Sequence, residues 1–261
     1  MHSAALAELG LAPEWTYEAI DVPPARFAAL VGSLTDQGFA GVNVTVPHKL
    51  AALAAADEAS PAARAIGAAN MLTFTGSGVV AENTDAAGII DALPESPAGM
   101  RALVMGAGGS ARAAIWALRE AGADVHVWNR TAAKAEQLAT AFGATLSSGT
   151  SDFDLILNAT TVGLAQANSD NAPAGQPLGA TGVDDLKALP IAADALHAEQ
   201  VVVDLVYGAN ETQLIAAARA AGATSVDGLE VLVRQGAASL HLWTGKKPPL
   251  ETMRAAARGS G

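Results

Sequence analysis

Residues 100–226 alternate short apolar runs with helical segments, and this alternation constrains the fold more than any other feature of the sequence. The apolar runs at 102–105, 153–157 and 201–206 have the length of strands rather than of helices. Strands that are apolar on both faces and separated by helices are typical of a parallel sheet covered on both sides. We therefore predict an α/β fold whose C-terminal part is a doubly wound parallel sheet.

A glycine-rich segment lies between the first of these strands and the helix that follows it. Its pattern is G-x-G-x-x-A, in the strand–loop–helix context that dinucleotide-binding motifs require. The first glycine allows a tight turn, the second lets a pyrophosphate approach the backbone, and the alanine lets the helix pack closely on its strand. The amides at the start of the helix would then face the phosphates. The segment predicts a Rossmann-type cofactor site formed by Gly106, Ala107, Gly108, Gly109, Ser110 and Ala111.

The end of the next strand indicates which dinucleotide is bound. An acidic residue at this position would bind a ribose 2′-hydroxyl, but the sequence here is Trp128-Asn129-Arg130-Thr131, with Lys134 shortly after. An arginine can pair with a 2′-phosphate and stack on adenine. We therefore expect NADP rather than NAD as the cofactor. In the alternative interpretation, Thr131 only caps a helix and Arg130 is solvated.

The N-terminal part contains a second cluster of polar residues. Residues 41–46 alternate as a half-buried strand, and a helix follows from Lys49. Asn43, Thr45 and Lys49 could therefore face one pocket at the strand's carboxyl end. Asp85 precedes a predicted helix at 86–93 and follows a predicted hairpin at 70–81. Each residue also has a simpler interpretation, since Lys49 could be a surface lysine and Asp85 a helix cap.

The remaining segments suggest two domains. The Pro- and Gly-containing loop at 94–99 is the best candidate boundary, and a long amphipathic helix at 229–243 could pack back on the N-terminal part. We expect one domain of residues 1–93 plus 229–261 and a second of residues 94–228. Within the first, residues 2–10 and 26–34 are predicted helices and residues 16–22 a predicted strand. Residues 165–185 lack periodicity and are expected to form a loop.

Composition excludes several classes of function. The net charge of −11 argues against nucleic acid or an anionic membrane as a partner, and no apolar run is long enough to span a bilayer. The sequence contains no cysteine, so disulfides and thiolate chemistry are excluded, which fits a cytoplasmic protein. The five histidines share no ligand spacing, so we predict no metal site.

The order and spacing of eight short motifs resemble the shikimate dehydrogenase family over nearly the full chain. The matching segments are Asn43–Lys49, Ile66–Asn70, Asn83–Asp85, Gly106–Ala111, Asn129–Thr131, Asn158–Thr160, Asp204–Tyr207 and Asp227–Gln235.

The resemblance implies reversible, NADPH-dependent reduction of 3-dehydroshikimate to shikimate, in a protein with two domains around a cleft. It implies that Lys49 and Asp85 form the catalytic pair. It further implies that the substrate is lined by Thr45, Asn70, Gln235 and Tyr207. The residues implied at the cofactor are the glycine segment with Asn129, Arg130 and Thr131, and, near the nicotinamide, Thr160 and Gly228.

One element of the family pattern is missing from the sequence. The family places a strand and a Ser-x-Ser-Pro loop, whose serines bind the substrate carboxylate, before the helix that begins here at Met1-His2. Without that strand, we expect an open sheet edge and exposed apolar surface in the substrate domain. Two alternatives follow: a quinate/shikimate dehydrogenase with looser substrate or cofactor choice, and a catalytically silent NADP-binding homologue. The sequence leaves monomer and homodimer equally open.

Overall fold

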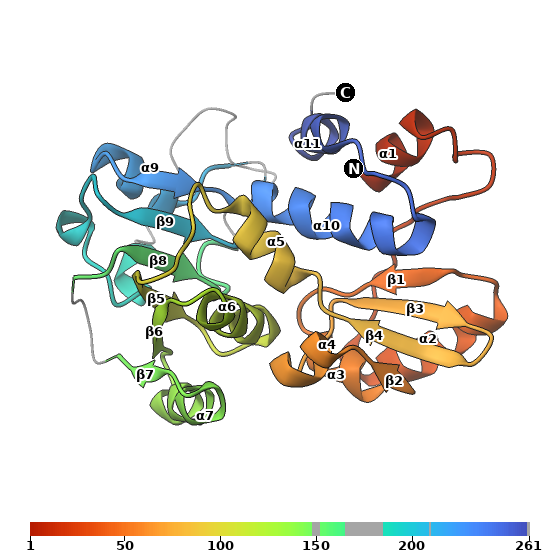
Figure 1. The fold of residues 1–261 in the computed structure, drawn as a ribbon, viewed down its shortest axis with the longest axis horizontal. Helices are drawn as coiled ribbons and strands as arrows, with labels where there is room; N and C mark the ends of the chain where they lie inside the picture. Colours follow the sequence, from red (N-terminus) through yellow and green to blue (C-terminus); the bar gives the residue numbers. More distant parts are fainter. Residues whose placement is uncertain (148–151, 165–184, 209, 260–261) are drawn as a thin grey trace. The chain divides into compact units, whose positions relative to one another are not determined.

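The computed structural model describes residues 1–147, 152–164, 185–208 and 210–259. The chain divides into two compact units: unit 1 comprises Met1–Asp91 with Leu232–Gly261, and unit 2 comprises Ala92–Val231. Each unit has its own sheet (Figure 1). The loop expected at 165–185 lies outside the described residues, apart from its last position.

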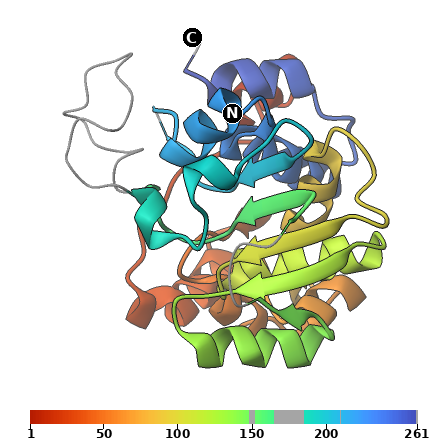
Figure 2. The same cartoon turned by 90° about the vertical axis from the view of Figure 1, so that its left-hand side faces the viewer.

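Unit 2 contains a six-stranded sheet in which every neighbouring pair is parallel, with the order β10-β9-β8-β5-β6-β7. The chain starts in the middle at β5, proceeds outward through β6 and β7, and then returns to build β8, β9 and β10 on the other side. This is the predicted doubly wound sheet, and its strands lie side by side in Figure 2. The strands are β5 (Arg101–Met105), β6 (Asp124–Trp128), β7 (Thr145–Leu146), β8 (Leu155–Asn158), β9 (Val201–Asp204) and β10 (Thr224–Val226).

Helical segments cover both faces of this sheet, as the apolar strands predict. The four residues 102–105 of β5 are all fully buried although alternate side chains point to opposite faces. On one face, Leu103 and Met105 pack in a core with Leu214 and Ala218 of α9. The helical segments of unit 2 are α6 (Gly109–Glu120), α7 (Ala132–Phe142), α9 (Gln213–Ala220) and the short 3-10 turns η2 (Asp185–Ala188) and η3 (Ala193–Ala195).

Unit 1 contains a smaller mixed sheet with the order β1-β3-β4-β2. The predicted hairpin forms its centre, because β3 and β4 pair antiparallel around Thr75–Gly78. β1 pairs with β3 alone among the described strands and therefore lies at the edge of the sheet. The strands are β1 (Gly41–Asn43), β2 (Glu58–Ala59), β3 (Met71–Thr75) and β4 (Gly78–Glu82).

Helices pack on both faces of the unit 1 sheet. α2 and α3 contribute Phe27, Val31 and Ala52 to a core with the strands. On the other face, α10 carries Val233 and Leu240 into a second core with α1 and α11. The helical segments are α1 (His2–Glu8), η1 (Pro24–Arg26), α2 (Phe27–Asp36), α3 (Lys49–Ala54), α4 (Pro61–Ile66), α5 (Asp85–Ala92), α10 (Gly228–Thr244) and α11 (Leu250–Ala257).

The predicted strand at 16–22 is wrong. Its side chains alternate as a strand requires, but a strand needs a neighbouring backbone, and no described segment pairs with it. Side-chain contacts hold the segment instead. Tyr17 stacks on the His2 ring at a centroid distance of 4.1 Å and donates a hydrogen bond to Asn43 Oδ1, and Val22 O lies 2.8 Å from His48 Nε2.

Candidate functional site

A buried ion pair lies in unit 1 between helices α3 and α5. Lys49 Nζ donates to Asp85 Oδ2 at 2.6 Å, and both residues are buried. Lys49 is the first residue of α3 and Asp85 the first residue of α5. A buried carboxylate is tolerated only when its oxygens are satisfied, so the contacts around this pair decide its geometry.

Asn70 fixes the second oxygen of the carboxylate. Its Nδ2 donates to Asp85 Oδ1 at 2.9 Å and lies 3.0 Å from Gln235 Oε1, while its Oδ1 accepts from Thr84 N at 2.6 Å. Asn70 is itself only 2% exposed. The amide therefore orients Asp85 from one side as Lys49 binds it from the other. Four sequence-predicted residues, Lys49, Asp85, Asn70 and Gln235, thus form one hydrogen-bonded cluster.

Asp85 does not act as the cap of α5. The nearby Asn83 performs that role, because its Oδ1 accepts from Ala86 N at 3.2 Å while its Nδ2 donates to Ala68 O. The carboxylate of Asp85 points instead to Lys49 and Asn70. The capping interpretation of Asp85 is therefore wrong, and its side chain is available for chemistry.

Two polar residues that the sequence analysis did not assign to the site, Ser239 and Thr84, extend the cluster, and Asn43, which it did name, joins them. Ser239 is fully buried on α10 and receives a hydrogen bond from Asn43 Nδ2 at 2.8 Å. Its Oγ lies 3.1 Å from Thr84 Oγ1, which also bonds to Asn70. The signal that could have revealed Ser239 is its spacing from Gln235, since residues four apart lie on the same face of a helix.

Helix α10 can reach the cluster because α5 presents a glycine to it. A Cβ added at Gly88 would lie 2.8 Å from both N and Cβ of Gln235. Contacts this short between a side chain and a helix backbone would force the two helices apart. Gly88 is therefore required for the close approach that brings Gln235 to Asn70.

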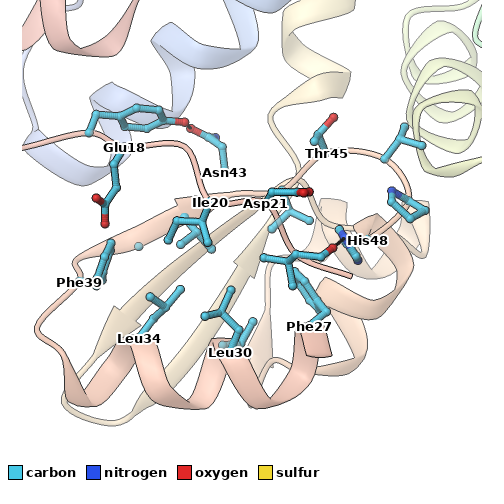
Figure 3. Close-up of a pocket in the computed structure, with 18 of the residues that line it drawn as sticks. Glu18, Ile20, Asp21, Phe27, Leu30, Leu34, Phe39, Asn43, Thr45 and His48 are labelled. Atoms are coloured by element: carbon cyan, nitrogen blue, oxygen red, sulfur yellow. Dashed lines mark hydrogen bonds between the residues drawn. The ribbon is translucent and has the colours of Figure 1, made fainter. Parts of the chain in front are cut away.

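Thr45 lies at a cavity in the same unit, and Asn43, which bonds to Ser239 of the cluster, lines this cavity as well. Thr45 is exposed and, with Asn43 and His48, lines a cavity of about 230 Å³ between residues 16–22, α2 and β1 (Figure 3). Ile20 faces the side chains of Leu30 and Leu34 across it. Neither Lys49 nor Asp85 is among the residues that line this space. β1 forms one edge of the sheet beside it.

The glycine loop of unit 2 has the geometry of a phosphate-binding turn. Gly106 has φ of 125°, and a Cβ there would lie 2.7 Å from Ala159 O, so only glycine fits. Gly108 is the N-cap of α6, and a Cβ added to it would meet open space. Ala111 is fully buried where α6 meets the sheet. The three positions match the roles predicted for a turn that leaves room for a pyrophosphate at the start of a helix.

The residues that follow β6 include two cations. Arg130, Thr131 and Lys134 are exposed, and Asn129 Nδ2 donates to Thr131 O at 3.0 Å. Thr131 occupies the N-cap position of α7, as the capping interpretation predicts, although its side chain makes no cap hydrogen bond. Two exposed cations and no carboxylate at the strand's end suit a 2′-phosphate better than a bare ribose.

A second buried carboxylate lies at the carboxyl ends of β8 and β9. Asp204 is fully buried and accepts from Asn158 Nδ2 at 2.9 Å, from Val206 N at 3.0 Å and from Thr212 Oγ1 at 2.6 Å. Burial raises the pKa of the Asp204 carboxyl from 3.8 to about 6, and the three donors oppose that rise. Thr160 bonds to Asn158 on the other side, and Tyr207 is exposed just beyond β9.

Two negative findings complete the site. Among the described residues, no group of three His, Asp or Glu side chains converges as metal ligands. No described helix is long and apolar enough to cross a membrane.

A doubly wound sheet with a phosphate-binding glycine loop, together with a second unit that holds a lysine–carboxylate pair, defines a dinucleotide-dependent oxidoreductase. Family models identify the family of oxidoreductases to which the chain belongs. The shikimate dehydrogenase substrate binding domain matches residues 1–72, the shikimate/quinate 5-dehydrogenase model matches residues 91–168, and the shikimate 5′-dehydrogenase C-terminal domain matches residues 228–258. The chain belongs to the shikimate dehydrogenase family.

Individual relatives agree with the family models. A shikimate dehydrogenase (NADP(+)) of Anaeromyxobacter is 42% identical, with 100% of this chain and 91% of that protein covered. The one of Methanopyrus kandleri is 38% identical over 98% of this chain and 88% of its own length. A shikimate 5-dehydrogenase of Thermus thermophilus, solved in complex with NADP(H) and shikimate, superposes with a TM-score of 0.84 at 38% identity, covering 100% of this chain and 93% of that one.

The contact between α5 and α10 is tested by Gly88→Ala. Because the new methyl group must displace the backbone of α10 at Gln235, we expect a loss of about 1–3 kcal/mol in the free energy of unfolding. The control is Gly76→Ala, since a Cβ at Gly76 meets open space, and its effect should stay within about 0.5 kcal/mol. Urea unfolding followed by tryptophan fluorescence measures both. Equal effects of the two substitutions would contradict the close-packing account.

Asp204 should make the folded protein more stable at low pH, whereas an ion-paired carboxylate makes it more stable at neutral pH. Because the pKa of Asp204 is raised in the folded protein, its contribution is fully present below pH 3.8 and is lost as pH rises through about 6. Relative to Asp204→Asn, the wild-type protein should therefore gain roughly 2 kcal/mol of unfolding free energy between pH 7 and pH 4. Urea unfolding of both proteins across this range measures the difference, and a constant difference would show that the pKa is not raised.

Proposed function

We propose that this protein catalyses the reversible, NADP-dependent reduction of 3-dehydroshikimate to shikimate. The observation that carries the proposal is the buried Lys49–Asp85 pair, held at 2.6 Å by Asn70 and Gln235. A charged pair of this kind is rarely buried for stability alone. Unit 2 adds a dinucleotide-binding turn, and the relatives named above are NADP-dependent enzymes that act on shikimate.

The pair suits the proton half of this reaction. NADPH, when bound, supplies a hydride to the carbonyl carbon. Negative charge then develops on the carbonyl oxygen, and the Lys49 ammonium stabilises that oxygen and donates a proton to it. Asp85 holds the ammonium in place through Oδ2 and accepts from Asn70 through Oδ1, so its position is fixed before substrate arrives. In the oxidising direction the same lysine receives the proton from the substrate hydroxyl.

The remaining proposed residues divide into two groups. Asn70 and Gln235 carry amides beside the pair that can bind the substrate's hydroxyl groups, and Thr45 and Tyr207 are exposed polar side chains proposed to contact it. The cofactor is proposed to lie against the glycine loop and the end of β6, with its nicotinamide half near Thr160 and Gly228. The residues proposed to hold it are Gly106, Ala107, Gly108, Gly109, Ser110, Ala111, Asn129, Arg130, Thr131, Lys134, Thr160 and Gly228.

The setting of this enzyme follows from the same proposal. We propose that it works in the cytoplasm, where the shikimate-forming step of aromatic amino acid biosynthesis needs no disulfide or membrane anchor. We propose a monomer or a homodimer as its working form. We also propose that residues 1–93 plus 229–261 form the domain that binds the substrate, and that residues 94–228 form the domain that binds NADP.

The role of Lys49 is tested by Lys49→Ala. Because the variant cannot donate a proton to the developing alkoxide, we expect kcat for shikimate oxidation to fall about 10²- to 10⁴-fold. Affinity for NADPH should not change, since Lys49 belongs to the other unit. The control is Lys246→Ala, which removes an exposed ammonium near the end of α10. Steady-state rates and calorimetric NADPH binding give both values, and an unchanged kcat would refute the assigned role.

Cofactor choice is tested by Arg130→Ala. A charge-assisted contact with the 2′-phosphate is worth about 1.5–3 kcal/mol, so the Kd for NADP⁺ should rise roughly 10- to 100-fold. The Kd for NAD⁺, which lacks that phosphate and can lose only the stacking of Arg130 on adenine, should rise much less and serves as the internal control. Calorimetric titration with both nucleotides measures the ratio. Equal binding of the two by the wild-type protein would favour the alternative with relaxed cofactor use.

A further inference from the structure

The buried carboxylate of Asp204 has no role in the reaction proposed above, yet three donors converge on it. Its Oδ1 accepts from Asn158 Nδ2 at 2.9 Å and from Val206 N at 3.0 Å, and its Oδ2 accepts from Thr212 Oγ1 at 2.6 Å. Burying a carboxylate completely costs desolvation free energy, and the raised pKa of Asp204 has the same cause. A neutral side chain would fill the space with less desolvation.

One arm of the network leads to the turn after β8. Since Asn158 gives its Nδ2 to Asp204, its Oδ1 faces Thr160, and there it accepts from Thr160 N at 3.0 Å and from Thr160 Oγ1 at 2.7 Å. Thr160 Oγ1 in turn accepts from Val162 N at 3.1 Å. A reversed Asn158 amide would present its NH₂ to the Thr160 N–H. The carboxylate therefore fixes which way the amide points, and the amide fixes Thr160.

The other arm leads to the start of α10. Asp204 Oδ1 holds the amide of Val206, and a Cβ placed on Gly228 would lie 2.5 Å from Val206 O. The backbone at Val206 thus abuts the first residue of α10. Asp204 Oδ1 therefore binds both Asn158, at the end of β8, and the backbone of Val206, which contacts the first residue of α10.

The strand order shows which half of a dinucleotide these segments meet. The glycine loop follows the central strand β5, and Arg130 follows β6 on one side of it. Asn158 and Asp204 end β8 and β9 on the other side, paired in register with each other. A dinucleotide whose pyrophosphate lies at the glycine loop and whose adenosine lies toward Arg130 must place its second nucleoside toward β8 and β9.

We propose that Asp204 is a positioning residue for the nicotinamide half of the cofactor site, acting through Asn158 on Thr160 and through Val206 on the start of α10. The inference rests on the proposed use of NADP. It assigns Asp204 no contact with the cofactor and no proton transfer. The role proposed for Asp204 is to hold Thr160 and the start of α10 in the positions against which the nicotinamide nucleoside binds.

The test compares two ligands that share only the adenosine half. NADPH carries both nucleosides, whereas 2′,5′-ADP carries only the adenosine with its 2′- and 5′-phosphates. In Asp204→Ala, we expect the Kd for NADPH to rise about tenfold or more, because the Asn158 amide and the Val206 N–H lose their acceptor. The Kd for 2′,5′-ADP should change less than about twofold, since the β6 side is untouched. Calorimetric titration of the full chain measures both.

Four further variants, one of them a double variant, separate positioning from simple destabilisation. Asp204→Asn retains a carbonyl oxygen for Asn158 and Val206, so its NADPH affinity should stay within about threefold of wild type. Thr160→Val removes the far end of the chain of hydrogen bonds and should show the same selective loss, and the double variant with Asp204→Ala should lose no more than the larger single effect. Asp194→Ala, which removes an exposed carboxylate of the same unit, should change neither Kd.

The outcomes that overturn the inference are specific. Equal loss of both ligands in Asp204→Ala, or a lower thermal midpoint with both Kd values unchanged, would show a purely structural role. If Asp204→Ala does not fold, unselective binding by Thr160→Val overturns it equally. Failure of the wild-type chain to bind 2′,5′-ADP would instead overturn the proposed NADP site itself, and this inference with it.

Discussion

The Lys49–Asp85 ion pair is the interaction on which the arrangement of unit 1 depends. Removing both charges from water costs several kcal/mol per ion, and one contact of 2.6 Å does not offset this unless the remaining polar atoms are also satisfied. Asn70 satisfies the second carboxylate oxygen, and Gln235 and Ser239 tie Asn70 and its neighbours to α10. The hairpin, α3, α5 and α10 must therefore pack together before the pair can exist. Gly88 permits this by letting α5 and α10 meet without an intervening side chain.

Unit 2 also buries a carboxylate, that of Asp204, but without a lysine beside it among the described residues. Within the described part of the chain, the hydrogen-bond donors to Asp204 are an amide side chain, a backbone N–H and a hydroxyl, and none of them is a cation. Such neutral donors hold an ionised carboxylate less strongly than a lysine would, which agrees with the raised pKa. The two units thus use buried acids differently. In the proposals made above, the acid of unit 1 holds the proton donor and the acid of unit 2 holds the wall of the nicotinamide site.

The sequence predicts most of the fold because the decisive signals are local. The apolar runs define the parallel strands, and Gly106 and Gly108 define the turn, each through the conformation or space that it alone allows. Lys49 and Asp85 could be suspected from their places at element boundaries, but not that they touch, since that contact joins residues 36 apart. The segment 16–22 was wrongly predicted as a strand because pairing depends on a neighbour that periodicity cannot reveal. Ser239 and Thr84 were missed for the same reason: their roles follow from tertiary contacts. The cavity along β1 was foreseen only as an open edge, whereas its lining by α2 required the structure.

The central claim is that the protein exchanges a hydride between NADP and shikimate, with the cofactor bound at the glycine loop and the proton handled by the buried Lys49–Asp85 pair. The most direct measurement is the formation of NADPH from NADP⁺ by the wild-type chain when shikimate is added, with quinate as the competing substrate. The account predicts NADPH formation that depends on shikimate, saturates with its concentration and exceeds that with quinate. NADPH that binds with normal affinity while neither substrate is oxidised would contradict the account and identify a catalytically silent member of the family.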